Sequence, residues 1–214
     1  MTEREWLVCM KRPDMMWAHV RGSVSERKQR LFAVACARHF WPSFVDDRSR
    51  AAVLASEEYA DGRLTRAELL VKHQAAYYPA SQDAWFAFAA SASEAESAAC
   101  SVALQGFHLA ARRVQRYTTS WHSLKRLACD LFREICGNPF RPVAIDPTWL
   151  AWQGGTIPKL AQGIYDDRAF DQLPVLADAL EEAGCADAEV LGHLRGPGPH
   201  ARGCWSVDLL LGKE

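Results

Sequence analysis

Apolar residues recur at helical spacing along most of the chain. In the stretch ERKQRLFAVACARHFW, residues 26–41, Leu31, Phe32, Val34 and Cys36 belong to a wide apolar stripe of the kind that a packed helix shows. Pro42 follows directly and ends the predicted helix. The same pattern predicts further helices over residues 47–61, 66–78, 81–116 (one helix or two), 120–135, 158–165 and 174–183.

Helix-start and helix-end signals support these assignments. Asp187 is the expected N-cap of another short helix. The final SVDLLL predicts a helix, with a short buried strand as the alternative that periodicity alone leaves open. Capping-box pairs occur at four helix starts: Thr2 with Glu5, Ser23 with Glu26, Thr65 with Glu68, and Ser93 with Glu96.

Residues 138–156, NPFRPVAIDPTWLAWQGGT, interrupt the helical pattern. Three prolines and two glycines predict an ordered irregular loop, which Trp149 and Trp152 hold against the core. Because no alternating strand pattern of useful length occurs, we predict an all-α protein, an irregular helical bundle in a single domain. Its helical body is expected over residues 1–136 and a loop-rich part with short helices over residues 137–214.

Composition is that of a globular chain without a strong charge. Of the 214 residues 49% are hydrophobic and the formal net charge is −1, so the overall charge does not indicate DNA or membrane binding. No apolar run is long enough for a membrane span, and no secretory signal is visible. Seven cysteines without a CxxC pair are typical of reduced thiols, so we expect a cytoplasmic protein.

Several motifs resemble one known family. They are TEREWL and RKQRLFAVACARHFW near the start, GNPFRPVAIDPTWLAW and LAQGIYDDRAFDQLPVLADALEEAGC further on, and RGPGPHARGCWSVDLLLGKE at the end. This set is similar to a large paralogous family of bacterial proteins of planctomycete type. The resemblance covers both ends of the chain around a variable middle. It implies kinship, and no activity or catalytic residue.

A zinc site is one hypothesis for the C-terminal part. Cys185, His193, His200 and Cys204 lie within twenty residues, and two thiolates with two imidazoles suit tetrahedral zinc. Their spacing, C-x7-H-x6-H-x3-C, is not that of a common zinc finger. The alternative is that both cysteines are buried core residues and His193 lies on the surface.

The stretch GPGPHARGCW, residues 196–205, raises two further hypotheses. Arg195, His200 and Arg202 are candidates for an anion site, but Pro197 and Pro199 remove backbone donors that a phosphate cradle needs. His200 and Cys204 are a candidate catalytic pair, although no orienting Asn or Asp accompanies them. We favour a rigid turn whose arginines bind carbonyls or carboxylates, and we predict no catalytic residue.

A basic segment suggests nucleic-acid binding. Residues 106–136 hold six basic and two acidic side chains, and such a face binds phosphates. The alternative is an ordinary solvated helix face. The basic residues are Arg112, Arg113, Arg116, Lys125, Arg126 and Arg133.

The leading hypothesis is a non-enzymatic adaptor that binds a protein partner. Residues 163–190 are strongly acidic, in contrast to the basic segment, and such charge patches steer partners. Trp149 and Trp152 are candidate anchors at the interface. A nucleic-acid-binding accessory protein is the second hypothesis, and a Cys/His zinc protein the third. No cofactor is expected unless the zinc hypothesis holds.

Overall fold

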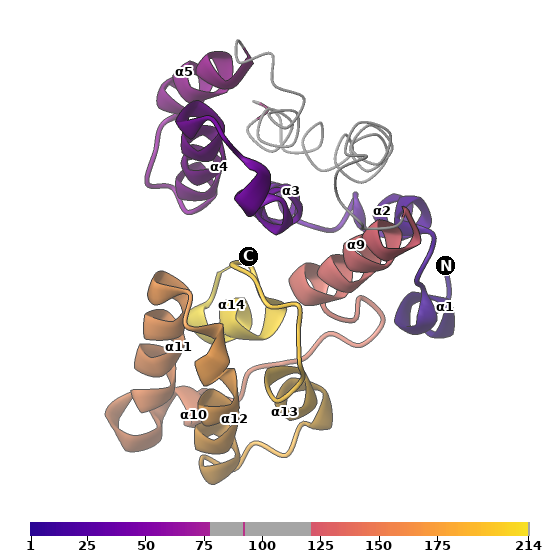
Figure 1. Ribbon diagram of the computed structural model, residues 1–214. Helices are drawn as coiled ribbons and strands as arrows, with labels where there is room; N and C mark the ends of the chain where they lie inside the picture. Colours follow the sequence, from indigo (N-terminus) through magenta and orange to yellow (C-terminus); the bar gives the residue numbers. More distant parts are fainter. Residues whose placement is uncertain (78–91, 93–120, 214) are drawn as a thin grey trace. The chain divides into compact units, whose positions relative to one another are not determined.

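The computed structural model describes residues 1–77, 92 and 121–213 (Figure 1). Within these ranges the regular structure is helical and no strand occurs, which confirms the predicted all-α class. The chain divides into two compact units, Met1–Arg133 and Glu134–Glu214. The boundary lies three residues before the end of the helical body expected from the sequence.

The N-terminal unit begins with two short helices, α1 (Glu3–Val8) and α2 (Pro13–Val20). The predicted capping box starts α1: Thr2 Oγ1 accepts from the Glu5 amide, and the Thr2 amide donates to the Glu5 carboxylate. Trp6 is fully buried, and Pro13 at the first turn of α2 has the backbone angle that a helix start needs.

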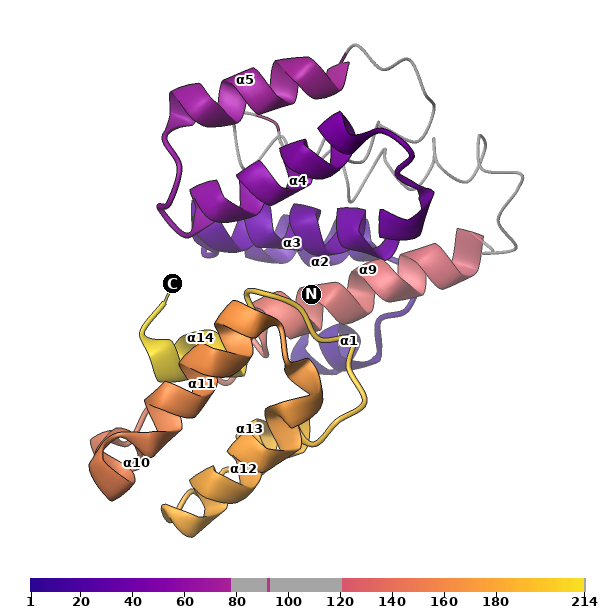
Figure 2. The same ribbon diagram turned by 60° about the vertical axis from the view of Figure 1, so that its left-hand side comes forward.

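Three longer helices follow, α3 (Glu26–His39), α4 (Asp47–Ala60) and α5 (Arg66–Tyr77), with a short 3-10 turn η1 (Trp41–Ser43). α4 packs against both α3 and α5 (Figure 2). Leu31, Phe32 and Val34 are buried as the stripe predicted. The capping box of Thr65 and Glu68 before α5 is confirmed by hydrogen bonds in both directions.

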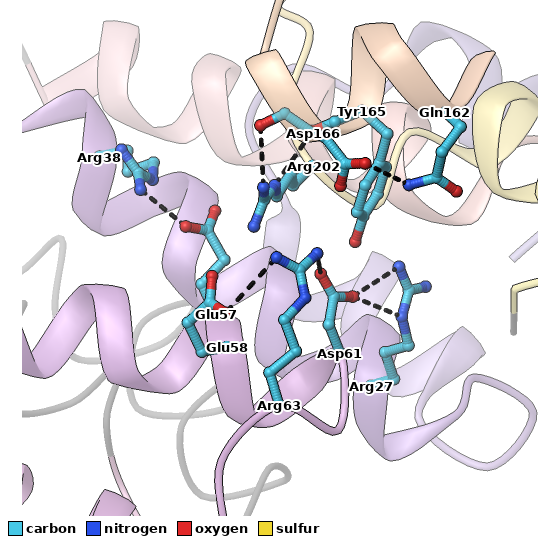
Figure 3. A network of polar contacts seen from close by, with 10 residues as sticks. All are labelled: Arg27, Arg38, Glu57, Glu58, Asp61, Arg63, Gln162, Tyr165, Asp166 and Arg202. Carbon is cyan, nitrogen blue, oxygen red and sulfur yellow. Dashed lines mark hydrogen bonds and ion pairs between the residues drawn. The ribbon is translucent and has the colours of Figure 1, made fainter. Parts of the chain in front are cut away.

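Buried ion pairs link α3 to the end of α4 (Figure 3). Arg38 binds the buried Glu57 carboxylate at 2.7 Å, and Asp61 accepts from both Arg27 and Arg63. Because the Glu57 and Asp61 side chains are only 1% exposed, these guanidinium contacts compensate for the hydration that both carboxylates lose.

Helix α9 (Trp121–Cys136) contributes Phe132 to the core of the N-terminal unit. The Phe132 ring stacks on Phe32, with centroids 3.9 Å apart, and lies 6.3 Å from the Trp17 ring. The Arg133 side chain donates to the backbone carbonyls of Trp6 and Cys9, and so holds the end of α1 against α9.

The C-terminal unit consists of short helices around one apolar core. They are α10 (Pro147–Ala151), η3 (Trp152–Gly154), α11 (Thr156–Asp167), η4 (Phe170–Gln172), α12 (Leu173–Glu182), α13 (Ala188–Leu194) and α14 (Trp205–Leu211). α11 contacts α10, α12 and α14, and α12 packs on α13 (Figure 2). Trp149 lies in this core, and Trp152 packs against it while partly buried.

Three sequence predictions need correction or lie outside the described residues. Ser23 does not cap α3, because its hydroxyl and amide close the end of α2 on the Val20 carbonyl, and Ser25 is the cap instead. The loop expected over residues 138–156 contains α10, since Asp146 and Pro147 form a helix start. The helix predicted over 81–116, with its capping box at Ser93, lies outside the described residues. SVDLLL is helical, as predicted, and belongs to α14.

Among the helices that the structure describes, none combines the length and apolar character that crossing a bilayer requires.

The stacked ring of Phe132 gives a first prediction. Phe132→Ala removes a fully buried aromatic ring and should lower the free energy of unfolding by about 3–5 kcal/mol. Leu7→Ala is the control, since Leu7 is 51% exposed, and should change it by less than about 0.5 kcal/mol. Urea titration followed by circular dichroism measures both. Equal effects of the two substitutions would show that Phe132 is not a core residue.

Candidate metal centre

Glu134 is a buried carboxylate in the last turn of α9. This is an unfavourable place for a negative charge, because the carbonyl end of a helix carries a partial negative charge. Gly137 ends the helix with a φ of +63°, and a Cβ there would lie 3.0 Å from Trp205 Cγ. Gly137 therefore allows the end of α9 to approach the start of α14 closely.

His193 comes from α13, which Asp187 caps as the sequence predicted. Val190, Leu191 and Leu194 face the core and fix the rotation of this helix. His193 lies in its last turn, with its ring 5.2 Å from the Trp205 ring. These contacts position the His193 imidazole beside Glu134 rather than on the open surface.

His200 and Cys204 come from the loop GPGPHARGC. Gly198 has a φ of +86°, and a Cβ on it would lie 2.7 Å from the His200 amide nitrogen, so only glycine fits there without displacing His200. The Cys204 amide donates to the Ala201 carbonyl, and Cys204 directly precedes α14. Loop backbone thus determines where both side chains point.

Four potential ligand atoms meet at this place. Glu134, His193, His200 and Cys204, here called the Glu134 cluster, each offer one atom, and these atoms all lie within 4.8 Å of one another. His193 Nε2 lies 3.2 Å from both Cys204 Sγ and Glu134 Oε2, and His200 Nδ1 lies 3.2 Å from the same Oε2. The other Glu134 oxygen, Oε1, accepts from the Ala201 amide.

The cluster is almost closed to solvent. The side chains of Glu134 and His200 are 2% and 11% exposed, that of His193 is 19% exposed, and Cys204 is buried. Burial raises the pKa of Glu134, but hydrogen bonds from His193 and His200 outweigh it and lower that pKa to about 2. Glu134 is therefore an anion at neutral pH.

Backbone contacts determine which nitrogen of His200 faces the cluster. His200 Nε2 lies 3.0 Å from the Gly196 carbonyl, which only accepts, so Nε2 carries a hydrogen and donates. On a neutral imidazole, Nδ1 then has a free lone pair directed at the Glu134 anion, and the two repel. A positive charge between them, either a proton on Nδ1 or a metal ion, removes this repulsion.

A proton at this position accounts for the contact of His200 with Glu134, and Cys204 Sγ also contacts Ser206 Oγ at 3.2 Å. Burial lowers the pKa of His200, yet contact with Cys204 and Glu134 raises it overall to about 10, which is the protonated alternative. That proton reaches one acceptor, whereas His193 Nε2 and Cys204 Sγ point to the same place. Burial and the Glu134 charge raise the pKa of the Cys204 thiol, and a bound cation would favour its thiolate.

The dimensions suit a tetrahedral ion. Zinc binds imidazole nitrogen or carboxylate oxygen at about 2.0–2.2 Å and thiolate sulfur at about 2.3 Å, so neighbouring ligand atoms lie about 3.3–3.6 Å apart. Three of the six distances between the ligand atoms are 3.2 Å, close to this value, and all six lie within 4.8 Å, so the ligand atoms have to move closer together to bind one ion. A donor set of thiolate, two imidazoles and a carboxylate favours zinc over the hard cations calcium and magnesium.

The structure brings three of the four predicted zinc ligands together and puts a different residue in the fourth place. Cys185 lies in the apolar core after α12, where its amide donates to the Leu180 carbonyl, and it is not part of the cluster. Glu134 was missed because it lies 66 residues before His200 in sequence. One signal was present: Glu134 follows Leu131 by three residues and so falls on the apolar face of its helix.

The two candidate anion-binding arginines, Arg195 and Arg202, bind other groups of the C-terminal unit. Arg202 is buried and donates to the Tyr165 and Asp166 carbonyls at the end of α11 (Figure 3), which is the turn-fixing role that we favoured. Arg195 pairs on the surface with Asp178 and Glu181.

Half of the candidate nucleic-acid residues are described. Arg133 binds Asp130 together with the two carbonyls in the N-terminal unit, and Arg126 lies 3.8 Å from Asp130. Lys125 is half-buried. Arg112, Arg113 and Arg116 lie outside the described residues, so nucleic-acid binding stays a prediction.

Comparison with known proteins adds no assignment: neither a family model nor a curated protein nor a solved structure matches the chain.

The left-handed conformation of Gly198 gives a second prediction. Gly198→Ala should lower the free energy of unfolding by about 1–3 kcal/mol, because its Cβ would press on the His200 amide in a strained backbone conformation. Gly192→Ala is the matched control. Gly192 is exposed within α13, with open space around it, so alanine there should stabilise by about 0.5–1 kcal/mol. Denaturant titration of both variants measures this, and a neutral Gly198→Ala would show that the loop does not need glycine.

Proposed function

We propose that the C-terminal unit, Glu134–Glu214, is a zinc-binding module and that Glu134, His193, His200 and Cys204 are the ligands. The single observation that carries this proposal is the convergence of four ligand atoms, from one helix end, a second helix and one loop, within 4.8 Å. A buried ion pair of Glu134 with one histidine would need neither the second imidazole nor the thiol at that place.

The proposed role of the metal is structural rather than catalytic. Catalytic zinc sites use three protein ligands and keep one position for water or substrate, whereas structural sites are closed by four. Here all four positions come from protein side chains, and the cluster is nearly buried. We therefore infer that zinc holds the end of α9, α13 and the loop before α14 together.

The size of the unit supports a structural metal. With about 80 residues, it lies near the size at which a single core supplies only a few kcal/mol and small domains add metals or disulfides. Its helices are short, with at most twelve residues in α11. Such helices depend on tertiary contacts for their stability, and a metal supplies strong ones.

An adaptor role is compatible with this proposal but gains no support from the tryptophans, since Trp149 is buried in the core and Trp152 packs against it. Binding of a protein partner therefore stays a prediction from the acidic segment.

Metal content is the first test of the module. Protein without a histidine tag, purified without chelators, should hold about one zinc ion per chain by mass spectrometry of its metals. Cobalt in its place should show thiolate-to-metal charge-transfer absorption, because one ligand is Cys204. Cys204→Ser should remove that absorption and weaken zinc binding at least about 100-fold.

The chain offers a matched control for this test. Cys185→Ser changes another buried cysteine of the same unit, one that lies outside the cluster, and should leave zinc stoichiometry and the cobalt spectrum unchanged. His200→Gln and Glu134→Gln should also weaken zinc binding, while helical circular dichroism persists; both keep the Cys204 thiolate, so the charge-transfer band should remain wherever cobalt still binds. Zinc-free wild-type protein that also fails to bind added zinc or cobalt would overturn the proposal and leave a protonated His200 beside Glu134.

Removal of zinc should loosen the C-terminal unit specifically. A free zinc concentration about 1,000 times the dissociation constant stabilises the bound fold by about 4 kcal/mol. Amide exchange that requires unfolding of the unit then becomes about 1,000-fold slower. Hydrogen-exchange mass spectrometry with and without chelator should show this slowing in peptides from α13 and α14. Peptides from α3 and α4 are the internal control and should exchange equally in both states. Equal exchange in α13 and α14 would contradict a structural metal.

A further inference from the structure

Two cysteines of the N-terminal unit lie in contact although they are 120 residues apart in sequence. Cys9 directly follows α1, and Cys129 lies within α9. Their sulfur atoms are 3.8 Å apart. A disulfide bond needs about 2.05 Å, so the sulfurs have to approach by about 1.8 Å for the bond to form.

The backbone around both cysteines is held in place. The Cys9 carbonyl accepts from Arg133 Nη1 at 3.0 Å, and the Trp6 carbonyl accepts from the same atom at 2.9 Å. Arg133 lies one turn after Cys129 on α9, so a single guanidinium fixes the Cys9 backbone beside Cys129. The contact between the sulfurs is thus part of the packing of α1 on α9.

The two thiols differ in access. Cys9 is partly exposed, whereas Cys129 is fully buried. Burial raises the pKa of Cys129 to about 12, and its contact with Cys9 adds to this, while the Arg133 charge opposes it. Cys9 is therefore the sulfur that an external reagent reaches first, and Cys129 reacts afterwards from inside.

We propose that Cys9 and Cys129 form a redox-active dithiol that closes to a disulfide by exchange with a small-molecule disulfide. The Cys9 thiolate attacks one sulfur of the small disulfide, whose S–S bond breaks, and the leaving thiolate takes up a proton. Cys129 then loses its proton and attacks the Cys9 sulfur of the mixed disulfide, releasing the second small thiol. The protein loses two protons and two electrons, and the small disulfide gains both.

This inference is independent of the proposed zinc module, because it uses other cysteines in the other unit. The disulfide would link the end of α1 covalently to α9 and would close a loop from Cys9 to Cys129, which is most of the chain of the N-terminal unit. A link across so long a loop restricts the unfolded chain strongly, so oxidation should stabilise this unit.

The test is exchange of the full-length protein with oxidised glutathione, followed by alkylation and peptide mass spectrometry. The expected product is a Cys9–Cys129 cross-linked peptide. The equilibrium constant for forming the Cys9–Cys129 disulfide from oxidised glutathione gives the effective concentration of one thiol at the other. This concentration should be about 30- to 1,000-fold higher in native than in urea-unfolded protein.

Single substitutions separate the two steps. Cys129→Ser should stop at the mixed disulfide and retain glutathione on Cys9, whereas Cys9→Ser should protect Cys129 from reaction. Cys136→Ser is the control, since Cys136 is a partly exposed cysteine on the same helix outside the pair, and it should leave the cross-link intact. Unchanged circular dichroism shows that each variant is folded. Two free thiols after exchange, or a cross-link from either residue to another cysteine, would overturn the proposal.

Discussion

The C-terminal unit depends on how the buried carboxylate of Glu134 is neutralised. An unpaired buried charge is far too costly for a fold whose net stability is only several kcal/mol, and the carbonyl end of α9 makes this position less favourable still. Within the unit, the Ala201 amide donates to one Glu134 oxygen, and the imidazoles of His193 and His200 contact the other. α13 and the loop before α14 must therefore meet the end of α9. The proposed zinc ion would account for the carboxylate, both imidazoles and the Cys204 thiol together.

Much of the fold can be read from local sequence, because helix periodicity and caps act over three or four residues. The stripe of Leu31 and Phe32 predicts α3, and Asp187 predicts the start of α13. Where two local signals compete, sequence reasoning is less secure. Ser23 and Ser25 both offer a hydroxyl before α3, and the turn that ends α2 decides between them. The helix start at Asp146 and Pro147 was hidden within a stretch rich in proline and glycine.

The sites are harder to predict, because their members meet only through tertiary packing. His193, His200 and Cys204 lie within twelve residues and stand out as metal-ligating types, but the same reasoning selected Cys185, which packs in the core. Nothing in the spacing separates a core cysteine from a ligand. Glu134 lies 66 positions before its partner His200, and Cys9 lies 120 positions before Cys129. Both separations are beyond the range of any helix pattern. What local sequence does show is an acidic residue on the apolar face of α9, which requires a partner.

X-ray absorption at the zinc edge tests the central claim most directly, because it reports the ligand atoms rather than the effect of losing them. The account predicts one sulfur at about 2.3 Å and three nitrogen or oxygen atoms at about 2.0–2.1 Å around the ion. Two or more sulfurs would mean that Cys185 or another cysteine is a ligand and that one of Glu134, His193 and His200 is not. A shell of six light atoms without sulfur would show a loosely bound surface ion and contradict the Glu134 cluster as the zinc site.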